Sequence, residues 1–313
     1  MNMKAIPAAL AAILGTSASF SAIADDHSHE ANWYGRINTA VSYESRDGDN
    51  ADSVDIKNIS SRFGVKGSED LGNGLSAVYR YEFGVASDIA DVQDNNRLSY
   101  VGLSGSFGTV TLGRVWSAAF NSVGTIMDVS QNVGGDAYNG LYRVSNALSY
   151  AVNAGPVALQ ADLVLDGDNP NSENVDQWNI GATLNAGPVT VAATYVDSDG
   201  GDADDSNYFG LAGRFNLESI WFGAGLSASD DGTVDDAQGI ALLAGGSAGD
   251  FGWWVSLENI QDDDAGLDDD IINFNVSRFL SKNARVYIEG AFNDAAAEGA
   301  DKTEILLGVR KDF

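Results

Sequence analysis

Residues 61–83 read SRFGVKGSEDLGNGLSAVYRYEF, and the fold is decided by the pattern in this stretch. In its second half, Leu75, Ala77, Tyr79, Tyr81 and Phe83 alternate with Ser76, Val78, Arg80 and Glu82. An alternation of period two predicts a β-strand with one apolar face, and the DLGNG at residues 70–74 is typical of a tight turn. The stretch is therefore predicted to be a β-hairpin.

The same alternation recurs to the end of the chain, for example in residues 33–43, 220–227 and 304–313. Seven tight connections alternate with longer segments, and they fall at residues 70–74, 105–108, 153–156, 185–188, 217–219, 248–250 and 281–283. The sequence NAGPV occurs twice at an offset of 32 residues, about the length of one hairpin repeat. Counting the strand-like segments gives about sixteen, which is compatible with the ~10 residues that a tilted membrane-spanning strand needs. We therefore predict an all-β protein, a 16-stranded antiparallel transmembrane β-barrel.

The charge of the chain is strongly negative and unevenly placed. It has 313 residues, with 45 Asp and Glu against 17 Lys and Arg, for a net charge of −28. Of the acids, 29 lie in seven spans that contain one base, Arg46, and the spans are residues 46–55, 87–95, 166–176, 197–205, 230–236, 262–270 and 294–301. We predict that these spans are solvated loops. Such a chain would repel a phosphate backbone, so nucleic acid is not an expected partner.

The composition argues against most catalysis. Cysteine is absent, and the only imidazoles are those of His27 and His29 in an acidic N-terminal segment. Thiolate chemistry is thereby excluded, and a histidine-based triad or metal site is not expected. We predict no enzymatic activity, no cofactor and no metal.

The N-terminus has the features of an export signal. Residues 1–24 carry Lys4, a short apolar run, and Ala22 and Ala24 at positions −3 and −1 of a cleavage site before Asp25. We therefore predict a cleaved signal peptide at residues 1–24 and a single barrel domain at 25–313. No later segment approaches the ~18 consecutive apolar residues of a spanning helix.

A soluble β-sandwich also shows alternation, so the membrane assignment needs further support. Support comes from the even strand count, the short and long connections in turn, and the terminal Phe313. Aromatic residues near strand ends are the last sign, and these are Trp33, Tyr34, Phe83, Tyr208, Trp253 and Trp254.

Several segments resemble the Gram-negative general (non-specific) porins. These are YGR at residues 34–36, SRFGVKGSEDLGNG at 61–74, RLSYVGLSGSFGTVTLGR at 97–114 and the terminal EILLGVRKDF at 304–313. The resemblance implies a homotrimer of sixteen-stranded barrels in the outer membrane, with the third extracellular loop folded into the lumen. It also implies recognition of the C-terminal Phe313 by the barrel-assembly machinery.

The candidate third loop is residues 117–139, SAAFNSVGTIMDVSQNVGGDAYN, the one long connection that is not rich in acids. Its GGD at residues 134–136 resembles the end of the porin constriction loop, although Asp136 is equally typical of a turn. In that family, loop carboxylates face a cluster of wall arginines across the narrowest part of the pore. The resemblance puts a loop acid at Asp128, whereas the second acid position holds Asn132, a departure that weakens the negative side.

The same resemblance implies that Arg62, Arg97 and Arg143 are the wall bases. Strand parity agrees, because each alternates with apolar neighbours, Arg143 with Tyr142 and Val144 among them. Arg80 shares the lumen parity and either extends the cluster or pairs with the neighbouring acid. The alternative for all of them is an ordinary solvated wall or a salt bridge that holds the loop.

A barrel of this kind is expected to work as a water-filled channel for passive diffusion of small hydrophilic solutes and ions. The acidic spans predict a mild cation preference at low salt, and they could bind lipopolysaccharide phosphates through divalent cations. The alternatives are a substrate-selective porin for sugars or peptides, and an acidic secreted or adhesive β protein that binds divalent cations. An aromatic track or a lysine ladder on the lumen face would indicate substrate selectivity, and lysines are sparse.

Overall fold

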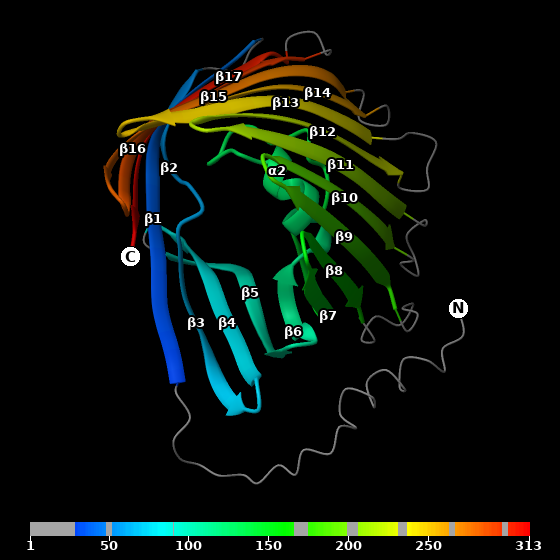
Figure 1. Cartoon of the computed structure of the whole chain (residues 1–313). Helices are drawn as coiled ribbons and strands as arrows, with labels where there is room; N and C mark the ends of the chain where they lie inside the picture. The colour runs from blue at the N-terminus through cyan, green and yellow to red at the C-terminus, as the bar shows by residue number, and fades with distance from the viewer. Residues whose placement is uncertain are drawn as a thin grey trace.

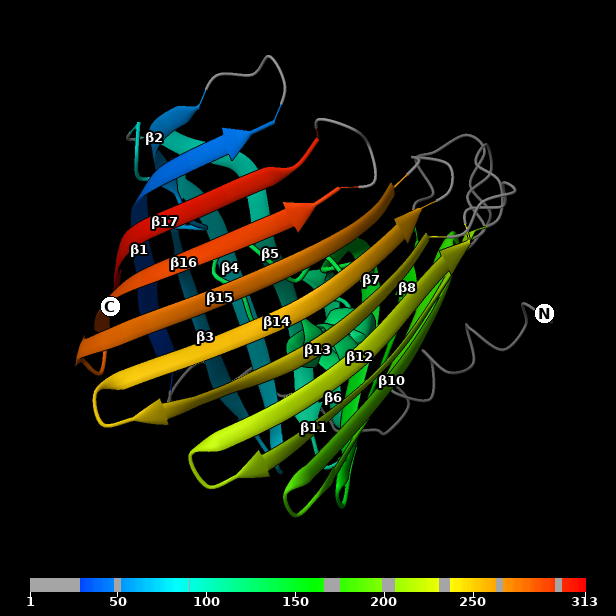
Figure 2. The ribbon, with the colours of Figure 1, turned by 90° about the horizontal axis from the view of Figure 1, so that it is seen from above.

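The computed structural model of this chain is a single closed β-barrel (Figures 1 and 2). It describes residues 29–47, 52–89, 91–165, 175–198, 206–230, 237–262, 267–295 and 300–313. The predicted signal peptide, residues 1–24, lies outside the described residues, so its cleavage stays a prediction.

The sheet contains seventeen strand segments. They are β1 (His29–Arg46), β2 (Ser53–Asn58), β3 (Arg62–Gly72), β4 (Leu75–Ala86), β5 (Asp91–Gly105), β6 (Gly108–Trp116), β7 (Arg143–Ala154), β8 (Val157–Val164), β9 (Gln177–Ala186), β10 (Val189–Ser198), β11 (Ser206–Leu217), β12 (Ile220–Asp230), β13 (Ala237–Ala248), β14 (Phe251–Asp262), β15 (Leu267–Ser281), β16 (Ala284–Asp294) and β17 (Lys302–Asp312). Each pairs antiparallel with its neighbours in the sheet, and β1 pairs with β17 to close the barrel.

The predicted sixteen strands are confirmed once β2 and β3 are counted as one. Both pair antiparallel with β1, β2 with residues 39–44 and β3 with residues 29–36. Between them Ser60 has a φ of 54°, a left-handed backbone conformation that interrupts the ladder. The second barrel strand is therefore continuous in direction but broken at residues 59–61.

All seven predicted tight turns connect consecutive strands, so the hairpin prediction holds throughout. Several of the predicted acidic loops are shorter than expected, and residues 53–55, for example, already belong to β2. Residues 91–95 already belong to β5, and of residues 262–270 the first ends β14 while the last four begin β15. The backbone ladder continues past the acidic side chains because Asp268 and Asp270 point into solvent, where their charge does not oppose strand pairing.

Burial along the strands is the reverse of that in a soluble protein. In β1, the side chains of Trp33, Ile37 and Val41 are 67%, 51% and 49% exposed. Asn38 and Ser42, which alternate with them, are each 1% exposed. An apolar band outside and polar side chains inside are the properties of a barrel whose outer face contacts lipid. Among the described residues, no helix is long and apolar enough to cross a membrane.

Three of the six aromatic residues predicted near strand ends do not face outward, and these are Tyr34, Tyr208 and Trp254. The hydroxyl of Tyr34 donates a hydrogen bond to Glu82 on the lumen side, and Tyr208 is 5% exposed within the lumen. All three have the inward strand parity, which a count of aromatic residues near strand ends ignores. Trp33, by contrast, stacks on Phe63 at 5.5 Å on the outer face.

The third loop folds into the lumen, as predicted, and the main apolar core of the barrel lies beneath it. The loop carries the π-helix η1 (Phe120–Gly124) and the short helix α2 (Thr125–Met127), which lie inside the barrel against β9 to β12 (Figure 1). The core joins apolar side chains of the loop to side chains of the wall: Ala119, Val123, Ile126, Met127, Ala137 and Tyr138 with Ala192, Val196, Tyr208, Ala212, Ala241 and Leu243.

Small residues on the wall allow this close approach. A Cβ at Gly181 would lie 2.4 Å from the carbonyl oxygen of Ala118, and one at Gly239 would lie 2.2 Å from that of Ala137. Both distances are far inside van der Waals contact, so the loop can pack here only against glycine.

Candidate functional site

A cavity of about 630 Å³ lies in the lumen between the third loop and a wall to which β1, β3, β5, β6 and β7 contribute. It brings together five of the six predicted site residues: Arg62, Arg97, Arg143, Asp128 and Asn132. Arg36, Trp116, Phe120, Asp136, Tyr138 and Tyr142 also line it. Residues far apart in the sequence therefore meet where the loop narrows the lumen.

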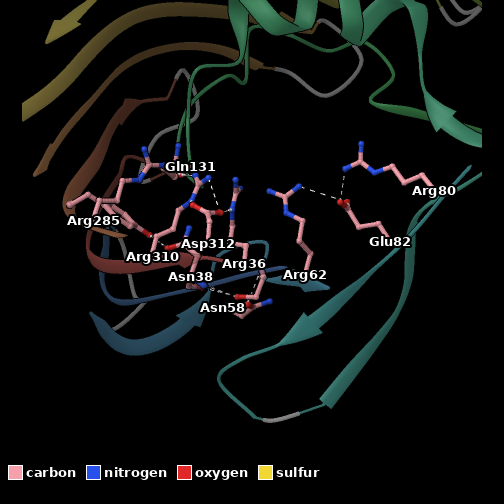
Figure 3. A network of polar contacts seen from close by, with 12 residues as sticks. Arg36, Asn38, Asn58, Arg62, Arg80, Glu82, Gln131, Arg285, Arg310 and Asp312 are labelled. Atoms are coloured by element: carbon pink, nitrogen blue, oxygen red, sulfur yellow. Dashed lines mark hydrogen bonds and ion pairs between the residues drawn. The ribbon is translucent and has the colours of Figure 1, made fainter. Parts of the chain in front are cut away.

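Arg80, the sixth predicted residue, does not line this cavity but shares a carboxylate with two residues that do. Glu82 is completely buried, and its oxygens lie 2.8 Å from Nη2 of Arg80 and 3.8 Å from Nη1 of Arg62 (Figure 3). Nε of Arg97 lies 2.7 Å from the same carboxylate. The Tyr34 hydroxyl donates to the same carboxylate at 2.8 Å. One negative charge thus serves three guanidinium groups, which leaves a local surplus of positive charge.

Arg143 is held differently. Its guanidinium carbon lies 4.1 Å from the centre of the Trp116 ring, a cation–π contact, and Arg97 lies 5.9 Å from the same ring. In the part of the chain that the structure describes, no carboxylate lies within 4.0 Å of Arg143, and its Nε has no hydrogen-bond partner. The alternation predicted that Tyr142 points away from the lumen, but Tyr142 lines the same cavity as Arg143. The alternation does not apply to Tyr142, because β7 begins only at Arg143.

A second group of arginines was missed at the sequence level. Nε of Arg36 lies 2.9 Å from Oδ1 of Asp312, and Nε of Arg310 lies 2.8 Å from Oδ2 (Figure 3). Arg285 and Arg310 both donate to the side-chain oxygen of Gln131 at the tip of the loop. These arginines have inward parity in β1, β16 and β17, so the alternation contained the signal, but no loop partner could be assigned without the fold.

The loop carries two carboxylates in the cavity. Asp128 accepts hydrogen bonds from the hydroxyl and the backbone N–H of Ser130 at 2.9 and 3.3 Å, and burial raises its pKa. Enclosure in the lumen, together with the carboxylates of Glu258 and Asp128, raises the pKa of Asp136 to about 6. The Asn132 side chain is exposed to the lumen and adds no charge.

Three wall carboxylates that the sequence analysis did not identify hold the loop through its backbone. Glu289 accepts the N–H groups of residues 131–133, the closest at 2.8 Å. Glu258 accepts those of Gly135 at 3.1 Å and Ala137 at 2.9 Å, and Asp162 accepts that of Ala118 at 2.7 Å. Acidic side chains at lumen parity are ordinary in a polar barrel interior, so nothing in the sequence distinguished these from solvated acids.

Two glycines of the GGD segment bring the tip of the loop into this position. Gly134 and Gly135 have φ values of 96° and 83°, which other L residues rarely adopt. A Cβ on Gly134 would also lie 2.8 Å from the side chain of Asn273 on the wall. The two glycines therefore contribute their backbone conformation, which also brings Asp136 into the lumen.

The charge of the cavity is opposite in sign to that of the chain. Four guanidinium groups line it, those of Arg36, Arg62, Arg97 and Arg143, against two loop carboxylates. Within the described ranges, no cluster of three or more His, Asp or Glu residues could hold a metal ion. The arrangement can bind and orient charged solutes in water.

Comparison with known proteins identifies a family. The family model described as "Gram-negative porin" matches residues 8–297. An outer membrane porin protein of Bordetella pertussis is 25% identical to this chain, with 90% of the chain and 93% of that protein covered.

Solved structures agree on the fold. The anion-selective porin from Comamonas acidovorans superposes with a TM-score of 0.78 at 20% identity, covering 91% of this chain and 100% of its own. The trimer form of OmpT from Vibrio cholerae gives a TM-score of 0.73 at 17% identity, covering 91% and 100%.

Proposed function

Since the chain belongs to the Gram-negative porin family and is an outer-membrane channel, not an enzyme, we propose that small hydrophilic solutes and ions cross its water-filled lumen by passive diffusion. The observation that carries the proposal is the cavity between the third loop and the arginine-lined wall. Passage is limited there, because the loop fills the part of the lumen beside β9 to β12 and leaves the arginine side open. Membership of the porin family argues against the alternative of a secreted adhesive protein.

The constriction residues in this proposal are Arg62, Arg97 and Arg143 on the wall and Asp128 with Asn132 on the loop, while Arg80 acts indirectly by sharing Glu82. Their common cavity supports the assignment for all but Arg80. Replacing Arg62 and Arg97 together by serine should change both single-channel conductance and ion selectivity. If both quantities stay as in the wild type, these residues do not form the constriction.

Ion selectivity in this proposal depends on two opposing sets of charges. The acidic spans at the loop end carry 29 acids, and the constriction has a surplus of guanidinium groups. The Debye length is about 30 Å at roughly 10 mM salt, so the distant acids act on a permeating ion, but it is only about 3 Å at 1 M. We therefore expect a mild cation preference at low salt that shrinks as salt rises and moves toward anions.

Reversal potentials in planar bilayers test this directly. A fixed ratio of KCl concentrations across the membrane, repeated at low and at high mean concentration, should give a cation-directed potential that decreases with salt. An anion-directed potential at the lowest salt would refute the role of the loop acids.

We also propose that the protein is a homotrimer, as the OmpT form named above is a trimer. A heat-modifiable band on an unboiled gel and the mass of the cross-linked species test this.

The C-terminal Phe313 exchanges backbone hydrogen bonds with Gly35 at 2.9 and 3.1 Å, and we propose that the assembly machinery recognises Phe313 before these bonds close the barrel. Divalent cations between the acidic loop end and lipopolysaccharide phosphates complete the proposed set of partners, and a chelator should weaken that contact.

A further inference from the structure

The constriction contains an aromatic cluster that an unselective aqueous pore does not need. Trp116 stacks on Phe120 with ring centres 4.5 Å apart, and Phe120 lies 5.0 Å from Tyr142. Tyr138 meets Tyr142 edge to face at 5.3 Å. All four rings line the cavity, and Tyr142 is 39% exposed to it. Trp116, Phe120 and Tyr142 thus present partly exposed rings to one side of the cavity, and Tyr138, which is 3% exposed, supports them from behind.

Guanidinium groups border this surface. Arg143 lies over Trp116 at 4.1 Å, and among the described residues no carboxylate is within ion-pair distance of it. Arg97 reaches the same ring at 5.9 Å, and it shares its carboxylate, Glu82, with two other arginines. The positive charge beside the rings is consequently undercompensated by the protein itself and available to an anion.

A flat apolar surface next to free guanidinium donors matches one solute class. A carboxylate would pair with a guanidinium, and an aromatic ring attached to it would stack on exposed rings instead of remaining in water. An aliphatic acid of the same size and charge would gain only the first of these contacts.

We propose that the constriction binds small aromatic carboxylates as they pass, with the ring against the aromatic cluster and the carboxylate at Arg143 and Arg97. The inference rests on the proposed channel function and names the solute class that the constriction favours. It fits the aromatic track that a substrate-selective porin was expected to show.

The test uses the full-length protein in planar bilayers, with KCl current as the readout. Benzoate and cyclohexanecarboxylate have the same charge and nearly the same size, but only benzoate is aromatic. We expect benzoate to block the current at a roughly 3- to 10-fold lower concentration than cyclohexanecarboxylate, the ratio typical of an added aromatic contact.

The variants separate the site from general effects. Trp116→Leu should reduce the ratio of the two blocking concentrations to about one, and Phe120→Leu serves the same purpose if the first variant does not assemble. Trp221→Leu is the matched control, because Trp221 also carries a stacked arginine, Arg214 at 4.0 Å, but does not line the cavity. This control should keep the wild-type ratio.

Equal block of the wild type by both acids would overturn the inference, and so would an unchanged ratio in the Trp116 or Phe120 variant. In either case the conducting channel itself would remain. If the purified protein formed no channels at all, the proposed function would fail instead, so the two failures are distinguishable.

Discussion

Glu289→Gln is a direct test of how the tip of the third loop is held. Glu289 is fully buried, and its Oε1 accepts the backbone N–H groups of Gln131, Asn132 and Val133 at 3.1, 2.8 and 3.1 Å. Its Oε2 accepts the side-chain amide of Asn275 at 2.7 Å. Glutamine keeps the size of the side chain but replaces one accepting oxygen by a donor, and it removes the charge from all four bonds.

The expected loss follows from these contacts. A hydrogen bond to a charged acceptor contributes about 1.5–3 kcal/mol, and a neutral one about 0.5–1.5 kcal/mol. The three bonds to the loop backbone, each weakened by about 1 kcal/mol, give roughly 3 kcal/mol against docking of the loop tip, whereas the bond to Asn275 lies within the wall. Since about 1.4 kcal/mol corresponds to a factor of ten, the undocked fraction of the tip should rise about 100-fold.

Single-channel recording and proteolysis measure that fraction independently. An undocked tip should produce frequent transitions between conductance levels in Glu289→Gln. The loop, residues 117–139, contains no Lys or Arg but has Phe120 and Tyr138, so chymotrypsin should cut it in the variant while trypsin should not.

The matched control is Glu304→Gln. Glu304 is another wall carboxylate, 4% exposed, but its partners are Lys57 at 2.7 Å and Lys302 at 3.0 Å instead of the loop. This variant should show no additional transitions between conductance levels and should resist chymotrypsin. If Glu289→Gln shows as few conductance transitions as the control and resists chymotrypsin equally, the Glu289 carboxylate does not hold the loop and the reasoning is wrong.

The remaining predictions concern charge, protons and packing. The double replacement of Arg62 and Arg97 by serine should increase cation preference, as read from reversal potentials, because two positive charges leave the cavity. Acidification from pH 7.5 to pH 5 should decrease cation preference, since Asp136, with a pKa of about 6, loses its negative charge in that interval; Asp136→Asn should abolish this step. Gly239→Ala should displace the loop and change conductance, because its Cβ would lie 2.2 Å from a loop carbonyl, whereas Gly213→Ala, whose nearest contact is 3.8 Å away, should conduct like the wild type.

Strand alternation predicted the barrel, the strand number and the seven turns because side-chain direction in a strand depends only on local sequence. It also predicted the side of the wall on which Arg62 lies. Arg97 reaches the lumen for another reason, because Leu98 and Tyr100 pair with the lumen-facing Glu82 and Arg80, and a register shift leaves Arg97 outside the regular alternation. The alternation failed at Tyr142, where the residue precedes the strand. The count of aromatic residues near strand ends failed at Tyr34, because such a count ignores the parity that separates the inward Tyr34 from the outward Trp33.

The wall carboxylates that hold the loop could not be predicted from the sequence, for a different reason. Asp162, Glu258 and Glu289 bind the backbone of residues more than forty positions away, and a backbone N–H has no sequence signature. Likewise, the fully buried Glu82 has one arginine, Arg80, on its own strand, but Arg62 and Arg97 are brought to it by the neighbouring strands. Such pairings depend on the closure of the whole barrel.

The anchors of the loop also impose an order on biogenesis. Residues 117–139 are synthesised well before β14 and β16, yet Glu258 and Glu289, which receive the tip, lie on these late strands. The loop therefore cannot complete its docking while the sheet is open at its C-terminal edge. A newly inserted barrel should pass through a stage in which the lumen is unobstructed, and the narrowing of the pore would mark the end of its assembly.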